Sequence, residues 1–562
     1  MSIRLPFLNQ AIQGDDLYYL AGAQHAQLDP LHPNHTKYVF MGKMVDMQGH
    51  PHPPLNAWYL GALLALTGDI EEIPFHAAYI PFSLIAALSM LSIARRFTES
   101  PLLATLLFIA VPPFFVNGNS LESDLPFLAF WMLAMSNYLN GRAVLAVVAA
   151  CVAALCAYQA ILLAPIFYFT PAARRRNWFA IAAPLATIGA FQLFERFTSG
   201  ALPAAVLGGY MQSYGWAQIA IKLKNAAALS GHLAVTLVSP IAWLGMRKQP
   251  HRFLLLWIGI FFAGALAIFF AGSARYLLPI AAPVCIVAAN SRFGVPALVV
   301  QSILSIAMAV VNYQHWDGYR QFALEVPNAR RVFVHGEWGL RFYMEQRGAI
   351  PLETGQKFRA GDIIVSSAYA EPLLGSRALL AEREITSPIP VRLVGLGSQS
   401  AYSSVGFGLL PFGISTVPMD RVRAEAVVDF KPTLEFVTIN ASEEANRHIA
   451  AGVSPNDRWA LKQASLLVKR PATASTLKVK FYVPANGVGR NLEVLLDGVK
   501  VTGATLDHDG IYELTAAVAA GTQTSASITI QVDKALKVDG DQRELGVILV
   551  EAGFVDRGFQ VK

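Results

Sequence analysis

The sequence predicts a polytopic α-helical membrane domain of about ten spans, followed by a small α/β unit and a C-terminal β-sandwich. Three observations lead to this fold class. First, the 562 residues are 54% hydrophobic and only 15% charged, whereas a soluble globular domain carries about 25% charged residues. Second, the apolar excess is confined to the region from about Pro74 to Asn312. Third, the segment from about Tyr313 to Lys562 has the composition of soluble protein, and its C-terminal part alternates apolar and polar residues.

Residues 1–74 precede the first long apolar run and are expected to form an external loop. The segment 53–68, "PPLNAWYLGALLALTG", is apolar but short, and no basic cluster separates it from the run at 75. We therefore expect a helix lying along the outer interface, with Trp58 and Tyr59 at headgroup level. Since the first span then enters from outside, we expect that an earlier span, needed to carry 1–74 across the membrane, is missing from this sequence.

The membrane domain is expected over 75–312. Its apolar runs are 75–94, 101–116, 123–140, 143–158, 159–170, 177–197, 225–245, 253–271, 275–290 and 295–312. Basic clusters stand at alternate junctions, at Arg95 and Arg96, at Arg142, at Arg174, Arg175 and Arg176, at Arg247, Lys248 and Arg252, and at Arg292. The positive-inside rule places all of them in the cytoplasm. Residues 1–74 and 313–562 are therefore expected on the outer side of the membrane.

Two soluble units are expected after the last span. Over 313–400, "RRVFVHGEWGLRFYMEQRGA" reads as a strand, a turn and an amphipathic helix, and "GDIIVSS" reads as a second strand. Over 425–562, strands such as "AEAVVDF", "TLKVKFYVP" and "SASITIQVD" alternate at sandwich-like spacing. "LLDGVKV" predicts a hairpin with Asp-Gly at its turn. Carbohydrate binding by this external β-sandwich is a hypothesis based on its expected shape and location.

Composition also argues against several classes of site and partner. The net charge of +6 comes from short basic clusters between apolar runs, so no nucleic-acid partner is expected. Cys151, Cys156 and Cys285 all lie inside apolar runs and are expected to be small core residues. Five histidines, His25, His32, His35, His50 and His52, invite a zinc interpretation. The His-x-His spacing alone is weak and no cysteine joins it, so neither a metal site nor a cofactor is expected.

The polar residues that stand out in this apolar chain all fall near the predicted outer face. They are Asp15, Asp16, His50, His52, Glu122, Asp124, Lys222, Lys224 and Arg275. Charged groups at membrane depth are costly and indicate function by default. The set combines carboxylates, which can accept a proton, with cations, which can hold a phosphate.

Four stretches of the sequence resemble, in the same order, those of the polytopic glycosyltransferases of the C superfamily that use lipid-phosphate sugars. They are "QGDDLYYLAG", "HPHPPLNAWY", "SLESDLPFLAFWMLAMSNY" and "ARYLLPIAAP". Within that superfamily the chain is most similar to the protein O-mannosyltransferases (family 39) and the aminoarabinose transferases of lipid A, over about 1–312. It departs from them in having Asp-Asp where Asp-Glu is usual and His52 where the lipid A enzymes have lysine. The β-sandwich is not general to the family.

The resemblance implies an inverting transfer of a sugar from a polyprenyl-phosphate donor to a hydroxyl of a protein, lipid or glycan acceptor. A carboxylate would act as general base, and Asp15 is preferred, with Asp16 remaining open as the alternative. The leaving phosphate needs cations, for which Arg275 is the main candidate, followed by His52, Lys222 and Lys224. The residues expected to position the substrates are His50, Glu122, Asp124 and Tyr276.

Simpler explanations exist for each group. Asp15, Asp16 and Asp124 could cap helices, and Arg275 could snorkel to the interface. The segment around Lys222 and Lys224 could contact lipid headgroups. A transporter or flippase with an external sugar-binding domain, or a non-catalytic glycan-assembly protein, is the alternative function. Transporters carry ionisable groups near mid-membrane and inverted repeats, whereas the polar groups here gather at one face, which favours the enzyme.

Overall fold

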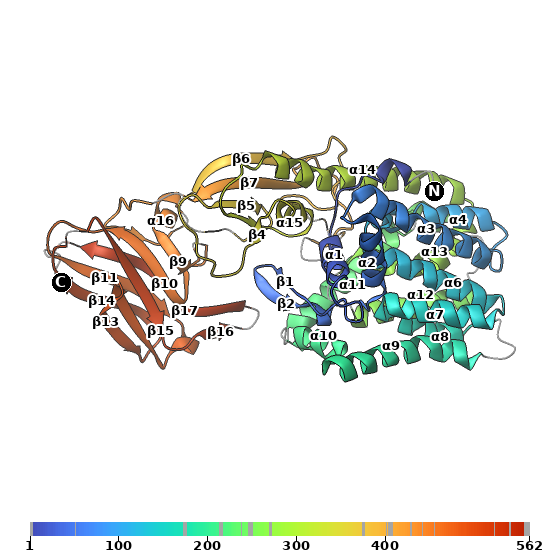
Figure 1. Cartoon of the computed structure of the whole chain (residues 1–562), viewed down its shortest axis with the longest axis horizontal. Coiled ribbons are helices and arrows are strands. Elements are labelled where there is room, and N and C mark those ends of the chain that lie inside the picture. Colours follow the sequence, from blue (N-terminus) through green and yellow to red (C-terminus); the bar gives the residue numbers. More distant parts are fainter. Residues whose placement is uncertain are drawn as a thin grey trace.

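The structure is a computed structural model. It describes residues 4–50, 52–171, 177–212, 217–237, 239–245, 251–268, 272–371, 373, 377–398, 400, 402, 408–427, 430–440, 442–454, 456–521, 523–538 and 541–555. A helical domain occupies one end of the molecule, a small mixed sheet lies in the middle, and a β-rich domain forms the other end (Figure 1). The expected basic residues Arg174 to Arg176, Arg247 and Lys248 lie outside the described residues.

The helical domain follows the expected apolar runs. Its helices are α3 (Glu72–Ala94), α4 (Pro101–Ile109), α5 (Pro112–Val116), α6 (Asp124–Leu139), α7 (Ala143–Cys156), α8 (Leu163–Tyr168), α9 (Trp178–Ser199), α10 (Pro203–Gln212), α11 (Ala217–Val235), α12 (Arg252–Ile268), α13 (Leu278–Ala289) and α14 (Gly294–Glu325). Within the described residues, α3, α9 and α14 are long and apolar enough to cross a membrane. A fourth span is counted if the bent pair 101–109 and 112–119 is one span. The expected number of about ten spans is therefore not confirmed.

Prolines and small residues explain two features of this bundle. The run 101–116 was expected to be one span, but it bends by 61° between α4 and the following helix. Pro112 and Pro113 begin α5, and because proline lacks an N–H it cannot continue the hydrogen-bond ladder of α4. On α7, Ala146, Ala149 and Ala153 are fully or almost fully buried, and such small residues allow close helix packing.

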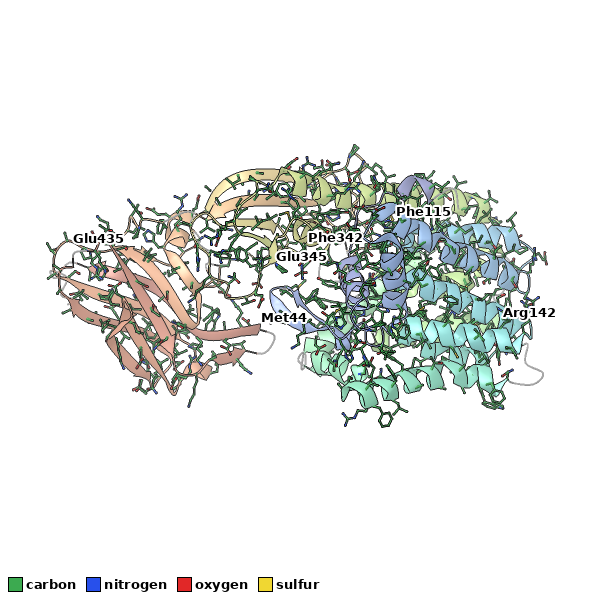
Figure 2. All side chains as sticks on the ribbon, in the orientation of Figure 1. Met44, Phe115, Arg142, Phe342, Glu345 and Glu435 are labelled. Carbon is green, nitrogen blue, oxygen red and sulfur yellow. The ribbon has the colours of Figure 1, made fainter. Side chains whose placement is uncertain are left out.

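The described basic clusters gather at one end of the helices. Arg96 donates hydrogen bonds to Asn140 Oδ1, which lies two residues before Arg142. Thr98 Oγ1 donates to Asn290 Oδ1 at 2.9 Å, close to Arg292. Figure 2 places Arg142 at the end of the helical domain farthest from Glu435 in the β-rich domain. In the described part of the chain, the basic junctions and the soluble domains therefore lie at opposite ends of the molecule. This agrees with the expectation that basic clusters occupy every second junction between apolar runs, on the side away from the soluble domains.

The segment before α3 packs onto the helical domain. It contains α1 (Asp16–His25), the hairpin β1 (Lys37–Phe40) and β2 (Lys43–Asp46), and α2 (Leu55–Thr67). Most of α1 is buried, including Tyr18, Tyr19 and Leu20. α1 and α2 lie against each other, and the expected helix over 53–68 is thus present as α2.

The α/β unit is a five-stranded sheet with the order β4-β3-β5-β7-β6. Its elements are β3 (Val332–His335), α15 (Trp338–Glu345), β4 (Ile350–Pro351), β5 (Ile363–Ser367), β6 (Arg377–Ile385) and β7 (Asp420–Val427). Two expectations need correction. The last apolar helix, α14, passes residue 312 and continues to Glu325, where its final turns pack against this unit. The strand expected to open the β-sandwich near "AEAVVDF" is β7, which pairs with β5 and β6 instead.

A largely buried carboxylate, Glu337, joins the α/β unit to the N-terminal segment. Its Oε2 accepts a 2.5 Å hydrogen bond from the Tyr18 hydroxyl of α1, and its Oε1 accepts one from the Met41 backbone N–H at 2.6 Å. Arg341 completes the contact as an ion pair. Met41 and Trp338 have φ values of 46° and 60°, a conformation that costs energy in residues with a side chain.

The C-terminal domain is one ten-stranded sheet rather than two separate sheets. Its elements are β8 (Phe436–Thr438), α16 (Glu443–Arg447), β9 (Ile449–Val453), β10 (Trp459–Lys469), β11 (Ser475–Val483), β12 (Arg490–Leu496), β13 (Val499–Leu506), β14 (Gly510–Val518), β15 (Ser525–Val532), β16 (Leu536–Val538) and β17 (Asp541–Val555). The central order is β13-β12-β15-β10-β17-β11-β14, and the terminal strands β13 and β14 also contact each other. This gives a nearly closed sheet around one apolar core, and the expected sandwich is not confirmed.

One local prediction in this domain is confirmed. β12 and β13 form the hairpin expected at "LLDGVKV", with Leu496 opposite Val499. Asp497 and Gly498 at its turn have φ values of 51° and 83°, as a two-residue hairpin turn with positive φ at both positions requires.

Candidate functional site

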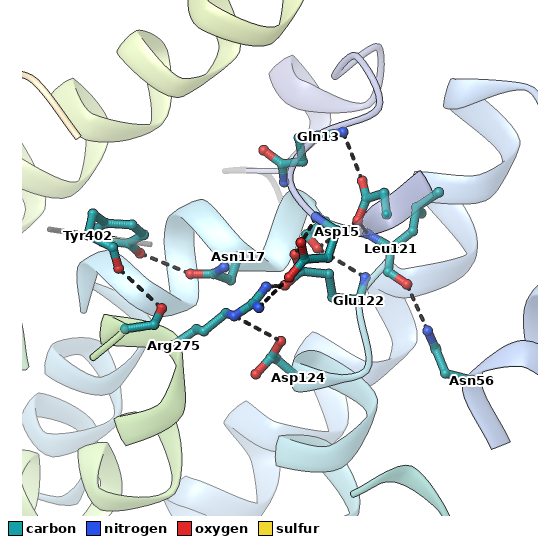
Figure 3. A network of polar contacts seen from close by, with 12 residues as sticks. Gln13, Asp15, Asn56, Asn117, Leu121, Glu122, Asp124, Arg275 and Tyr402 are labelled. Atoms are coloured by element: carbon teal, nitrogen blue, oxygen red, sulfur yellow. Dashed lines mark hydrogen bonds and ion pairs between the residues drawn. The ribbon is translucent and has the colours of Figure 1, made fainter. Parts of the chain in front are cut away.

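Arg275 lies at the centre of a cluster of carboxylates that come from distant parts of the sequence. It stands just before α13, and its guanidinium reaches between two other segments (Figure 3). Its Nη2 lies 2.7 Å from Asp15 Oδ2, Nη1 forms an ion pair with Glu122 Oε2, and Nε lies 3.9 Å from Asp124 Oδ2. The structure thus brings together four residues that the sequence analysis selected.

The carboxylates around Arg275 differ in their access to solvent. The Asp15 side chain is 36% exposed, against 9% for Asp124 and 3% for Glu122, and Arg275 itself is 14% exposed. Asp15 occupies the N-cap position of α1, yet its side chain makes no capping hydrogen bond. The simple explanation for Asp15, helix capping, is therefore not realised. Asp15 is the carboxylate of this cluster that an incoming molecule can reach best.

The neighbouring Asp16 has a different environment. It is fully buried, and it accepts hydrogen bonds from the Gln13 backbone N–H at 3.1 Å, the Ser120 hydroxyl at 2.9 Å and the Leu121 backbone N–H at 2.7 Å. Burial raises the pKa of Asp16 to about 7 even though these hydrogen bonds lower it. Asp16 therefore ties the start of α1 to residues 120–121, and the two members of the acidic pair are no longer equivalent.

Gly14, directly before the acidic pair, has two reasons to be glycine. Its φ is +47°, and a Cβ atom there would lie 2.9 Å from Glu122 Oε1. The same oxygen accepts a 3.1 Å hydrogen bond from the Asp15 backbone N–H. Burial raises the pKa of Glu122 well above its usual value, although Arg275 opposes this effect. "QGDD" is thus a tight turn built around the Glu122 carboxylate.

The second motif, "HPHPPLN", supports the same region through a residue that the sequence analysis missed. Asn56 Nδ2 donates to the Leu121 carbonyl at 2.8 Å. The Tyr79 hydroxyl lies 2.6 Å from Asn56 Oδ1 and 2.8 Å from the same carbonyl. The sequence did offer one sign of this role: Asn56 is an amide inside the otherwise apolar stretch 53–68, and a buried amide requires hydrogen-bond partners.

The two histidines of that motif pack against α1. The ring centroid of Tyr19 lies 4.9 Å from that of His50 and 5.7 Å from that of His52. Burial lowers the pKa of His50 to about 3 and that of His52 to about 4. His52 Nδ1 lies 3.3 Å from the Cys156 carbonyl, and because a carbonyl can only accept, Nδ1 carries the proton. At neutral pH, His52 is therefore an uncharged acceptor at Nε2, which disfavours its expected role as a phosphate-binding cation.

The two lysines expected at the phosphate lie on α11, and their environments differ. Lys222 Nζ donates to the carbonyls of Leu266 at 2.9 Å and Ala267 at 3.2 Å. These carbonyls belong to the last turn of α12, where carbonyls lack helical partners and the helix dipole favours a cation. Lys224 is exposed. These observations give Lys222 a capping role and leave Arg275 as the cation among the carboxylates.

Further residues hold the segment around Arg275 in place. Tyr276 lies beside the guanidinium, with Arg275 Cζ 5.4 Å from its ring centroid. The Tyr402 carbonyl accepts hydrogen bonds from Ser273 Oγ and the Ala274 N–H, both at 3.1 Å. The Tyr402 hydroxyl donates to Asn117 Oδ1 at 3.0 Å (Figure 3). Tyr402 comes from the part of the chain after the last span, so nothing in its local sequence indicated this role.

Comparisons with known proteins find similarity to solved structures. No family model matches the chain, and no curated protein matches it either. The solved structures that it resembles include ArnT from Cupriavidus metallidurans bound to undecaprenyl phosphate (TM-score 0.41, 13% identity, covering 75% of this chain and 96% of that one). They also include arabinofuranosyltransferase AftD from mycobacteria (0.37, 12%, 99% and 59%) and the oligosaccharyltransferase of Archaeoglobus fulgidus (0.37, 11%, 97% and 94%). The chain thus spans about three fifths of AftD.

These neighbours are glycosyltransferases of the C superfamily, the group that the four sequence motifs resemble. Their identities and TM-scores are low, so the residues around Arg275 carry the functional argument. Those residues combine one reachable carboxylate, Asp15, one guanidinium and two buried carboxylates beside it, Glu122 and Asp124. Such a site can take up a proton at Asp15 and bind an anion at Arg275.

Proposed function

We propose that this protein is an integral-membrane inverting glycosyltransferase that moves a sugar from a polyprenyl-phosphate donor to an acceptor hydroxyl at the outer face of the membrane. The observation that supports this proposal is the ion pair between the reachable carboxylate of Asp15 and the largely buried guanidinium of Arg275. A general base and a phosphate-binding cation, the two groups that this transfer requires, lie side by side.

Asp15 serves as the general base. The acceptor hydroxyl gives its proton to Asp15 while its oxygen bonds to the anomeric carbon. The bond between that carbon and the phosphate oxygen breaks at the same time, and its electron pair leaves with the polyprenyl phosphate. Attack opposite to the leaving group inverts the configuration of the sugar carbon. General-base catalysis of this kind contributes roughly 10²–10⁴-fold to the rate.

Arg275 binds the donor phosphate. Guanidinium groups bind phosphate through two parallel hydrogen bonds, and one candidate donor, Nη2, is now paired with Asp15. When the phosphate takes this position, the Asp15 carboxylate is released to accept a proton. Donor binding thereby prepares the base.

The buried acids make this exchange electrostatically feasible. Four carboxylates near a phosphate would repel it if all were ionised. Burial raises the pKa of Asp16 to about 7 and raises that of Glu122 well above its usual value. Burial therefore favours the neutral form of Asp16 as a further negative charge arrives, while the charge of Glu122 is offset by its ion pair with Arg275. Asp124, His50 and Tyr276 then help to position the substrates.

The proposal is tested in cells by deleting the gene and measuring lipid-linked sugars by mass spectrometry. We expect one polyprenyl-phosphate sugar to accumulate and one glycosylated protein, lipid or glycan to disappear. Wild-type protein restores both, Asp15→Asn restores neither, and the exposed-site control Asp509→Asn restores both. Transfer at the wild-type rate by Asp15→Asn contradicts the mechanism. An unchanged amount of donor that has moved to the other leaflet favours the flippase alternative.

Donor binding is tested with purified protein and undecaprenyl phosphate. We expect Arg275→Met to weaken binding at least tenfold, because it removes the cation of the site. The matched control, Lys224→Met, removes one positive charge from an exposed position and leaves binding unchanged. Equal affinities for Arg275→Met and Lys224→Met contradict the role of Arg275.

A further inference from the structure

We propose that Asp29, His32 and His35 form a binding site for a divalent transition-metal ion, with Zn²⁺ as the preferred occupant. The three residues follow α1 at the spacing Asp-x2-His-x2-His, and one ligand atom from each lies within 4.8 Å of the others. Two imidazoles and one carboxylate are established ligands of zinc and related ions. The site is separate from the Arg275 cluster and does not depend on the proposed transferase activity.

Hydrogen bonds on α9 fix which nitrogen of His32 carries the proton. The Thr198 hydroxyl donates to the Phe194 carbonyl at 2.7 Å, so its oxygen can only accept from His32 Nε2, which lies 2.9 Å away. In a neutral imidazole, Nδ1 then holds a lone pair. That nitrogen lies 2.9 Å from Asp29 Oδ2. The Nδ1 lone pair and the carboxylate oxygen repel each other at this distance unless a proton or a cation lies between them.

His35 has the same arrangement. Its Nε2 lies 2.7 Å from Glu195 Oε2, and because the carboxylate accepts, Nδ1 is left to offer a lone pair. Metal-bound histidines usually donate the other ring N–H to a carboxylate or another fixed acceptor. Glu195 and Thr198 supply these acceptors from consecutive turns of α9.

Packing of the rings favours a shared metal ion over two separate protons. The His32 and His35 rings stack with centroids 4.4 Å apart and 22° between their planes, and the Phe194 ring also stacks with His32, with centroids 5.5 Å apart. Two imidazolium rings at this distance repel each other, whereas one divalent ion neutralises Asp29 and binds both rings. Three protein ligands leave one tetrahedral position for water.

The bound ion would fasten the segment after α1 to the end of α9. The Glu195 side chain is only 7% exposed, so the anchoring point is buried. His25 is half-buried and is not among these ligands, and His50 and His52 pack against Tyr19 instead. The five histidines that the sequence placed in one region therefore separate into the proposed metal-binding pair His32 and His35, the pair His50 and His52 against Tyr19, and His25, which belongs to neither pair.

The test uses the full chain, purified in detergent without a polyhistidine tag and stripped with a chelator. We expect wild-type protein to bind one Co²⁺ per chain, with visible absorption bands of a four-coordinate ion, and one Zn²⁺ by calorimetry. Zn²⁺ should raise its unfolding temperature. His32→Gln/His35→Gln should lose binding at least 100-fold, and Thr198→Val should weaken it roughly tenfold or more by removing a partner of one ligand. His25→Gln is the control and should bind as wild type.

Two results would overturn this proposal. One is that wild-type protein binds neither ion at micromolar concentration, which means that the histidine–carboxylate contacts are ion pairs only; this result does not depend on whether any variant folds. The other is that His32→Gln/His35→Gln binds the ion as tightly as wild type, which places the ion elsewhere. Because the readouts are stoichiometry, absorption and unfolding temperature, they stand whatever the transferase assay shows.

Discussion

Replacing Gly14 by alanine tests whether the tight turn before the acidic pair shapes the site. Two costs follow from the structure. A residue with a Cβ at φ +47° costs about 1–2 kcal/mol of stability. The new Cβ would also lie 2.9 Å from Glu122 Oε1. The oxygen must therefore move by about 0.5 Å to reach ordinary van der Waals contact.

Glu122 is poorly able to move, because its carboxylate is paired with Arg275 and accepts the Asp15 N–H. A shift of about half an ångström must therefore pass to the base or to the cation. Misplacement by about 1 Å can cost roughly 100-fold in rate, so we expect Gly14→Ala to lose about tenfold in transfer per folded molecule.

Gly68→Ala is the matched control. Gly68 also has a positive φ, +80°, at the end of α2, but nothing lies within 4 Å of a Cβ built there. Both variants should lose stability by about 1–2 kcal/mol, measured by thermal unfolding in detergent, and only Gly14→Ala should lose transfer. Equal losses of transfer in the two variants would refute the contact with Glu122 as the reason for the glycine.

Three further predictions follow from the same structure. The pKa of Asp16 is about 3.8 in the unfolded state and is raised to about 7 in the folded state, so the folded protein binds the Asp16 proton more tightly. This proton therefore stabilises the fold fully below about pH 4, and the stabilisation is lost as the pH rises toward 7. Unfolding measured across this range should show the decline in wild type and a flatter profile in Asp16→Asn; parallel profiles would contradict the assignment. Lys222→Met should lower stability by about 1 kcal/mol without changing binding of undecaprenyl phosphate, whereas Lys224→Met should change neither; weaker binding by Lys222→Met would return that lysine to the phosphate site. Glu337→Gln should weaken the contacts to Tyr18 and Met41 and speed hydrogen exchange in β1 and β2, and unchanged exchange would show that this carboxylate does not hold the hairpin.

The sequence predicted the positions of several apolar helices, such as α3, α6 and α7, because hydrophobic runs act locally, whereas the run expected at 225–245 is α11 at Ala217–Val235. The hairpin at Asp497-Gly498 was equally accessible, since its turn chemistry is contained in two residues. Strand pairing was not accessible in the same way. β7 has the alternation expected of a C-terminal strand but pairs with β5 and β6. Period-2 patterns show that a strand has a buried face without showing which sheet it joins.

Within the site, residue types were easier to predict than roles. Asp15, Glu122, Asp124 and Arg275 meet as expected, because each stood out as a charge in an apolar setting. The difference between Asp15 and Asp16 depends on burial by Ser120 and Leu121, more than 100 positions away. The neutrality of His52 likewise depends on its burial, which outweighs the opposing effect of its contact with Cys156. Such properties arise only after the chain has folded.

The Glu337 contact has a consequence for how this protein can be divided. Tyr18, which donates to Glu337, stands two residues after Asp16 on α1. The α/β unit is therefore part of the foundation of the acidic site and not an appendage. A chimera joined after Val427, the last residue of β7, would keep this foundation whole while exchanging the ten-stranded domain. One joined at residue 312 would cut through α14 and transplant the two aspartates without the carboxylate that holds their helix, so the smallest portable unit of this chain extends well past its membrane helices.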